Sequence, residues 1–187
     1  MSRLGGFRGY VRLAARPAAL LLAASAVTAA EPDPAPALRE QVAANVRISD
    51  PARAELVRKA VLEAFDSLAR GKCQAIFSDF RDAAGSTLQE KLDALGETPQ
   101  SYLRLVFFYD GSDQRVCRST PAQKISAVTA TGSRAVLVCG SSFEKGRPKP
   151  FHAEAVIIHE TLHSLGLGEN PPTSDEITWR VFLRCAH

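Results

Sequence analysis

The 187-residue sequence lacks the features that mark several large classes of protein. It contains a single methionine, at position 1. We find no internal repeat, no glycine-rich phosphate loop and no nucleophile elbow of the kind that serine hydrolases carry. No apolar run reaches the roughly 18 to 20 residues that a membrane-spanning helix needs. These absences count against a repeat protein, a phosphate-loop nucleotide-binding protein, a serine hydrolase and a membrane-anchored protein.

The N-terminus has the order of a secretory signal peptide. Four arginines precede the apolar run Ala18–Ala24, and small residues continue to Ala30. A charged region, an apolar region and a small-residue cleavage site follow one another in this way in export signals. We therefore predict a signal peptide over residues 1–30 and a secreted or periplasmic mature chain that begins near Glu31. We expect no stable membrane association after cleavage.

Charge is nearly balanced in the predicted mature chain. The full sequence has 23 basic and 20 acidic residues, and removal of the four arginines of the predicted signal leaves 19 basic residues against 20 acidic ones. Binding to nucleic acid or to an anionic membrane surface needs clustered positive charge. We therefore expect neither as a partner.

The four cysteines are Cys73, Cys117, Cys139 and Cys185, and no two of them form a C-x-x-C pair. An even number of cysteines in an exported chain predicts disulfides rather than a zinc ribbon or a redox pair. Three sets of two bridges are compatible with the sequence. We favour Cys117 with Cys139, joining neighbouring strands, and Cys73 with Cys185, joining the first and last helical regions.

The segment that follows the predicted signal is rich in proline. Three prolines lie within Glu31–Ala37, a composition typical of an extended linker. We predict a linker over residues 31–50 and one folded domain over residues 51–187.

Helices are predicted in the first part of this domain. Asp50 can cap a helix that has Pro51 at its first position, and apolar residues then recur on one face. Thr87 and Glu90 form a capping box that opens another helix, which ends at Gly96.

Strands are predicted in the middle of the domain and helices at its end. The apolar run Leu103–Tyr109 predicts a central strand covered on both faces. Ile125–Thr131 and Arg134–Cys139 predict a hairpin. A helix follows over Ala153–Leu165, and a capping box at Thr173 opens a C-terminal helix. This order predicts an α+β fold with helices packed on a small mixed β-sheet.

The helix Ala153–Leu165 carries the sequence His159-Glu160-Thr161-Leu162-His163. Residues four apart lie on the same face of a helix, so His159 and His163 can bind one metal ion, and their imidazole nitrogens suit zinc. Glu160 can then act as a general base on a metal-activated water. The pattern is expected on the order of 0.005 times in a shuffled chain of this composition. The simpler alternative, two buried histidines in a core, leaves polar groups that are costly to bury without partners.

A third ligand is predicted just beyond this helix. If the helix continued, Glu169 would lie about 9 Å further along the axis than His163. A left-handed Gly166 would end the helix and reverse the chain, and Gly168 would add freedom for Glu169 to return to the ion. Glu176, on the C-terminal helix, is the alternative third ligand.

The segment from His159 to Glu169 reads H-E-x-x-H-x-x-G-x-x-E and resembles the extended motif of the metzincin clan of zinc peptidases. In that clan the last residue of the motif is usually His and sometimes Asp, and a methionine-containing turn lies below the metal. This chain has Glu169 at the matching position and no methionine after Met1. Gluzincins such as thermolysin instead take a glutamate from a later helix, which would be Glu176 here.

The resemblance implies a minimal zincin-like domain that hydrolyses peptide bonds. It implies one zinc ion held by His159, His163 and Glu169, with Glu160 as the catalytic general base. It also implies a peptide or protein substrate that pairs with a sheet-edge strand from the region between Ile125 and Cys139.

Two functions are compatible with these residues. The first is an exported zinc metallopeptidase, and the second is a non-catalytic, zinc-stabilised secreted binding domain. Glu160 favours catalysis, because a structural zinc site needs no carboxylate beside its first ligand and normally fills all four positions with protein groups.

Overall fold

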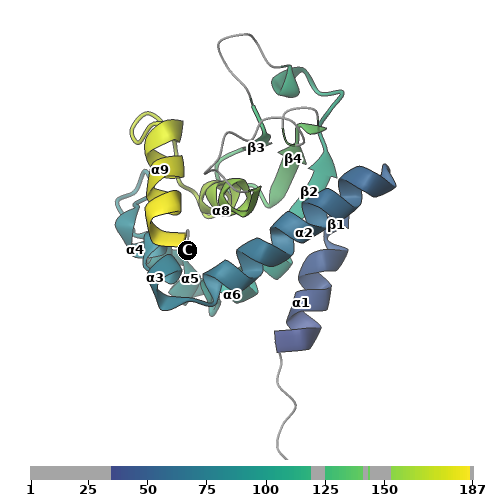
Figure 1. Ribbon diagram of the computed structural model, residues 1–187. Helices are drawn as coiled ribbons and strands as arrows, with labels where there is room; N and C mark the ends of the chain where they lie inside the picture. Colours follow the sequence, from purple (N-terminus) through teal and green to yellow (C-terminus); the bar gives the residue numbers. More distant parts are fainter. Residues whose placement is uncertain (1–34, 119–124, 141–142, 144–152, 186–187) are drawn as a thin grey trace, which may run out of the picture. The chain divides into compact units, whose positions relative to one another are not determined.

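The computed structural model describes residues 35–118, 125–140, 143 and 153–185. The predicted signal peptide, residues 1–30, lies outside them. In the described part, helices pack on a small mixed sheet of four strands (Figure 1), so the predicted α+β fold is confirmed. The structure has no helix in these ranges that is both long and apolar enough to span a membrane.

The elements have the following bounds. The α-helices are α1 (Ala35–Ala44), α2 (Pro51–Leu68), α3 (Gly71–Gln74), α4 (Ile76–Asp79), α5 (Leu88–Leu95), α6 (Pro99–Tyr102), α8 (Ala153–Ser164) and α9 (Ser174–Cys185). The strands are β1 (Val46–Arg47), β2 (Phe107–Asp110), β3 (Ala127–Thr129) and β4 (Ala135–Val138), and the short 3-10 helices are η1 (Leu103–Leu105) and η2 (Arg115–Cys117).

The sheet has the order β1-β2-β4-β3, with β1, β2 and β4 parallel and β3 antiparallel to β4. The predicted hairpin is therefore confirmed. One row of paired residues, Val46, Phe108, Val136 and Thr129, points to the same side of the sheet, and its three apolar members are buried. Tyr109, in the next row, is 40 % exposed, so the expectation that β2 is covered on both faces is wrong.

The apolar run that begins at Leu103 is only partly a strand. Its first three residues form η1, directly after α6, and β2 begins at Phe107. Thr98 and Ser101 form a capping box and Pro99 is the first residue of α6, so the chain enters this run with a helical conformation. A short apolar run does not by itself distinguish a strand from a buried helical turn.

The segment 31–50, predicted as a linker, contains α1 and β1 in its described part. Val42, Val46 and Ile48 are buried in the core, and Leu38 packs against it. The prolines lie at the start of the segment, and the apolar residues further on give it a place in the core.

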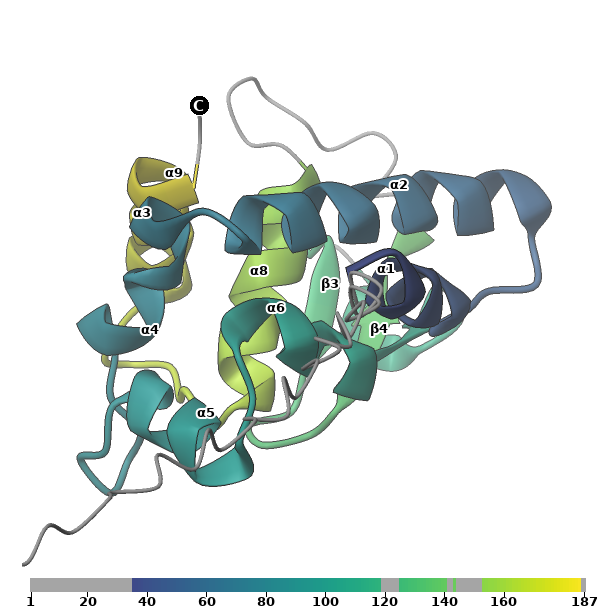
Figure 2. The same ribbon diagram turned by 90° about the horizontal axis from the view of Figure 1, so that it is seen from below.

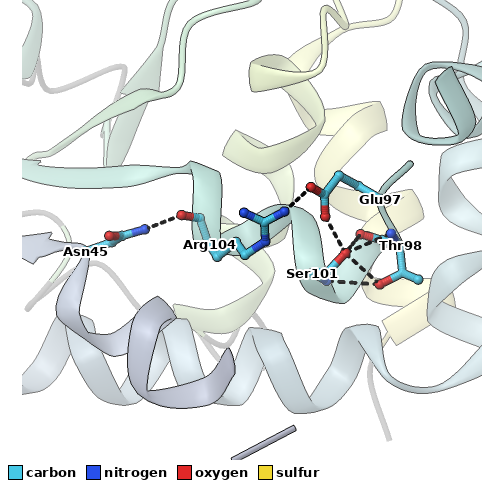
Figure 3. Close-up of polar contacts among 5 residues, drawn as sticks. All are labelled: Asn45, Glu97, Thr98, Ser101 and Arg104. Atoms are coloured by element: carbon cyan, nitrogen blue, oxygen red, sulfur yellow. Dashed lines mark hydrogen bonds and ion pairs between the residues drawn. The ribbon is translucent and has the colours of Figure 1, made fainter. Parts of the chain in front are cut away.

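Asn45 fastens this segment to the sheet. Its side-chain Nδ2 donates hydrogen bonds to the carbonyl oxygens of Arg104 at 2.8 Å (Figure 3) and of Val106 at 3.1 Å. Its own carbonyl accepts from the backbone N–H of Phe108 at 3.1 Å. Figure 3 also shows Arg104 paired with Glu97 beside the start of α6. Asn45 is itself buried, and the NH2 group of its side chain is satisfied by the two backbone carbonyls.

The predicted helix ends are largely confirmed. Asp50 caps α2 by accepting from the backbone N–H of Arg53 at 2.7 Å, with Pro51 as the first helical residue. The capping box at Thr87 opens α5, and Gly96 ends it in the left-handed conformation. Helix α2 ends at Leu68.

Helix α8 occupies a central place. It packs against α2, α9 and β3, and both views show it between α9 and the strands (Figure 2). Nearly every residue of α8 is buried, which is typical of a helix surrounded by other elements.

Two disulfides connect the four cysteines in the predicted pairing. Cys73 in α3 is bonded to Cys185 at the end of α9, and Cys117 is bonded to Cys139. Cys117 lies in η2 rather than on a strand. Disulfides fit a chain that folds in an oxidising compartment.

Replacing Cys73 and Cys185 together by alanine should lower the free energy of unfolding by more than the same change at Cys117 and Cys139. The bridges span 112 and 22 residues of sequence, and loop-closure entropy then gives about 5 and about 3 kcal/mol, respectively. Urea unfolding of the parent and of the two double variants measures the loss of unfolding free energy in each. A larger loss in the Cys117/Cys139 variant would contradict this reading.

Candidate metal centre

Helix α8 buries three ionisable side chains in the middle of the fold. His159, Glu160 and His163 are 6 %, 5 % and 6 % exposed. Burying polar groups this far from water costs free energy unless protein groups or a ligand form hydrogen bonds with them. The partners of each side chain therefore indicate what the site is built to hold.

The two imidazole rings face one another on the same side of α8. Their Nε2 atoms are 2.9 Å apart. On the far side of each ring, Nδ1 of His159 lies 2.9 Å from the hydroxyl oxygen of Thr178, and Nδ1 of His163 lies 2.8 Å from the carbonyl oxygen of Leu167. Partners at Nδ1 of this kind fix the ring orientation of metal-binding histidines and direct Nε2 to the ion.

A glycine turn ends α8 directly after His163. The backbone N–H of Gly166 donates to the carbonyl of His163, and that of Leu167 donates to the carbonyl of Leu162, the two hydrogen bonds of a Schellman motif. Gly166 has φ 110°, a conformation that L-residues with a side chain rarely adopt. The predicted reversal at Gly166 is confirmed, and it also brings the Leu167 carbonyl back to the ring of His163.

The reversed chain returns Glu169 to the two imidazoles. Its Oε1 lies 3.2 Å from Nε2 of His163 and 3.8 Å from Nε2 of His159. The potential donor atoms of the three residues all lie within 4.8 Å of one another. Ligands of a tetrahedral zinc ion, at about 2.0–2.2 Å from the metal, are about 3.3 Å apart, close to the three separations of 2.9, 3.2 and 3.8 Å. The three side chains could hold a metal ion.

The protonation state of His159 is also suited to a metal. Burial, assisted by the charge of His163, lowers the pKa of His159 to about 3. The ring is therefore neutral near pH 7, the form in which imidazole binds metals. A cation between the rings and the Glu169 carboxylate would be attracted by both.

Glu160 lies beside this group with one oxygen unsatisfied. No described residue gives its Oε2 a hydrogen bond of acceptable geometry, and the same is true of the buried hydroxyl of Thr129. Burial raises the pKa of Glu160 to about 7, although the nearby Thr129 and the charge of His163 act in the opposite direction. A buried, unpartnered carboxylate oxygen is the exception in folded proteins and often marks a functional group.

Glu176, the alternative third ligand, serves a different purpose. Its carboxylate accepts hydrogen bonds from the backbone N–H and the hydroxyl of Thr173, and its own N–H donates to that hydroxyl. This is a capping box at the start of α9, and these hydrogen bonds lower the pKa of Glu176. The side chain is exposed.

Three groups near the site were not identified from the sequence. Thr129 comes from β3, Thr178 from α9, and the carbonyl of Leu167 from the turn after α8. The two threonines are isolated in sequence from the motif and become neighbours only through packing. The carbonyl was predictable in principle, because a left-handed Gly166 returns the next residue to the end of the helix.

No family model, no curated protein and no solved structure matches the chain. The resemblance to metzincins therefore stays a prediction that depends on the eleven residues of the motif.

Replacing Gly166 by alanine should weaken metal binding and lower the free energy of unfolding by about 1–3 kcal/mol, the usual cost of a strained backbone conformation. The new Cβ would also lie 2.8 Å from the ammonium nitrogen of Lys91. Gly168 provides the matched control, since a Cβ there has no neighbour within 4 Å. Calorimetry measures the stability of both variants, and metal titration measures their metal affinity. Equal effects of the two substitutions would show that the turn at Gly166 is unimportant.

Replacing Glu169 by alanine should weaken metal binding severely, because it removes one of three donors. The same change at Glu176 should leave metal content unchanged and lower only the thermal midpoint, because it removes a helix cap. Elemental analysis after dialysis measures both. Metal lost from the Glu176 variant and kept by the Glu169 variant would move the third ligand to α9.

Proposed function

We propose that the protein is an exported zinc-dependent peptidase. The observation that carries this proposal is the convergence of His159, His163 and Glu169 on one point, with the buried carboxylate of Glu160 next to it in the chain. The export part is supported by the two disulfides and by the N-terminal sequence.

The donor set favours zinc in a catalytic site. Two imidazoles and one carboxylate are the ligands of several zinc hydrolases, in which the fourth position is left to water or substrate. Structural zinc sites are instead closed by four protein ligands, most of them thiolates or imidazoles. All four cysteines are used in disulfides and offer no thiolate.

The bound ion would supply a Lewis acid that polarises both the attacking water and the scissile carbonyl. Glu160 would accept a proton from that water as its oxygen attacks the carbonyl carbon. The carboxyl group would then donate this proton to the amide nitrogen as the carbon–nitrogen bond breaks. The orphaned Oε2 of Glu160 is the atom we assign to this transfer, because its hydrogen-bonding capacity is not used by the described protein groups.

Strand β3 is the proposed contact for the substrate main chain. Within the described sheet it is an edge strand, and it packs directly against α8. Thr129, the last residue of β3, lies close enough to Glu160 to affect its pKa. An extended peptide that added to this edge would form backbone hydrogen bonds and pass beside the general base.

Replacing Glu160 by glutamine should leave zinc content unchanged and reduce peptide hydrolysis by about 10² to 10⁴-fold, the usual contribution of general acid–base catalysis. Glutamine keeps the shape of the side chain and cannot accept the proton. Glu154→Gln, in the first turn of the same helix, is the matched control and should retain parental rates. The measurement is cleavage of a fluorogenic peptide library by the purified mature protein, with and without a chelator.

Two results would contradict the proposal. A Glu160→Gln variant that cleaves at the parental rate would assign the base to another group. A parent protein that holds stoichiometric zinc and cleaves no peptide in the library would favour the non-catalytic, zinc-stabilised binding domain.

A further inference from the structure

The two imidazoles of the metal centre have different kinds of partner at Nδ1. His163 faces the carbonyl oxygen of Leu167 at 2.8 Å, and a carbonyl can only accept a hydrogen bond. In its neutral form, which metal binding needs, the ring of His163 therefore has its proton on Nδ1 and a lone pair on Nε2, the atom that lies 3.2 Å from Oε1 of Glu169. His159 faces the hydroxyl of Thr178 at 2.9 Å, and a hydroxyl can donate or accept. The hydroxyl of Thr178 can therefore form a hydrogen bond with either neutral tautomer of His159.

His159 also has a second partner for its proton. Its Nε2 lies 2.9 Å from Nε2 of His163, which carries a lone pair. Without a metal, His159 can donate Nε2–H to His163 while its Nδ1 accepts a hydrogen bond from the hydroxyl of Thr178. In this tautomer Nε2 of His159 has no lone pair for a metal. Metal binding requires the other tautomer, in which the proton is on Nδ1 and Thr178 accepts it.

We infer that Thr178 is a positioning residue of the metal centre, whose hydroxyl reverses its direction when the ion binds and so satisfies Nδ1 of His159 in both tautomers. The inference rests on the metal centre of the proposed function and not on peptide hydrolysis. It makes α9 part of the centre, although α9 provides no ligand in this assignment.

Burial makes this hydroxyl hard to replace. His159 is 6 % exposed, so solvent has little access to an Nδ1–H that Thr178 does not accept. A buried donor left without an acceptor costs the free energy of its lost hydration. Without Thr178, this free-energy cost would apply to the metal-bound state, because only in that state must Nδ1 of His159 carry the proton.

The helix that carries Thr178 is held firmly against the rest of the domain. Cys185, at its C-terminal end, is bonded to Cys73 in α3. Arg184 makes two hydrogen bonds to the carboxylate of Asp79, at 2.7 and 2.8 Å. A hydroxyl delivered by such an element keeps its distance from the ring while only its hydrogen rotates.

Substitutions at Thr178 test the inference through metal affinity. Thr178→Val keeps the shape and removes the hydroxyl, and it should weaken zinc binding about 10- to 100-fold, the usual effect of losing a partner of a metal-binding histidine. Thr178→Ser should restore the parental affinity. Thr161→Val is the matched control, because the buried hydroxyl of Thr161 donates to the carbonyl of Ile157 within α8 and, among the described residues, forms no hydrogen bond with a ring of the two histidines. Competition with a chromogenic chelator measures zinc affinity in all four proteins.

Nitrogen-15 NMR of the histidine rings tests the tautomer directly. The metal-free parent should show His159 protonated on Nε2, and the zinc-loaded parent should show it protonated on Nδ1. His163 should be protonated on Nδ1 in both. This readout needs no catalytic activity.

The outcomes separate this inference from the proposed peptidase. If zinc binding weakens in Thr178→Val, recovers in Thr178→Ser and is unchanged in Thr161→Val, the inference stands even when no peptide is cleaved. It is overturned if Thr178→Val binds zinc as tightly as the parent, or if His159 has the same tautomer with and without zinc, even when peptides are cleaved. A parent protein that binds no zinc overturns both.

Discussion

Helix α8 has to end within one turn of His163 if a third donor from the following segment is to reach the two imidazoles. A longer helix would carry the next residues away along its axis at 1.5 Å per residue. The left-handed Gly166 makes the reversal, and the hydrogen bonds of the turn fix the position of the residues that follow. One local backbone constraint therefore determines both the partner of the His163 ring and the return of Glu169.

Several buried polar groups of α8 have hydrogen-bond partners in the described structure, whereas one carboxylate oxygen has none. Thr161 and Ser164 donate to carbonyls of their own helix, and Tyr102 donates to the Ser164 carbonyl. These contacts remove the cost of burying hydroxyls in a core. Glu160 has no such arrangement for Oε2 in the described structure. This contrast within one helix is the observation behind the role that we propose for Glu160.

Features that depend on neighbouring residues in the chain could be predicted from the sequence. The caps at Asp50 and Thr87 and the glycine turn at Gly166 depend on residues within one helical turn, so a pattern of a few letters was sufficient. The sequence did not predict contacts that packing creates. The tie from Asn45 to the residues before β2 joins positions about 60 residues apart, and the approach of Thr178 to His159 depends on how α9 packs on α8. No short pattern contains that information.

The bridge between Cys73 and Cys185 joins positions 112 apart in sequence, and every residue of the candidate metal centre lies between them. A single cut of the backbone between these cysteines would leave the two fragments covalently joined. The tether would keep the severed pieces at an effective concentration on the order of millimolar, so the fragment with α9 could dock again on α8. The two fragments of a cut molecule would thus separate only after the disulfide is reduced.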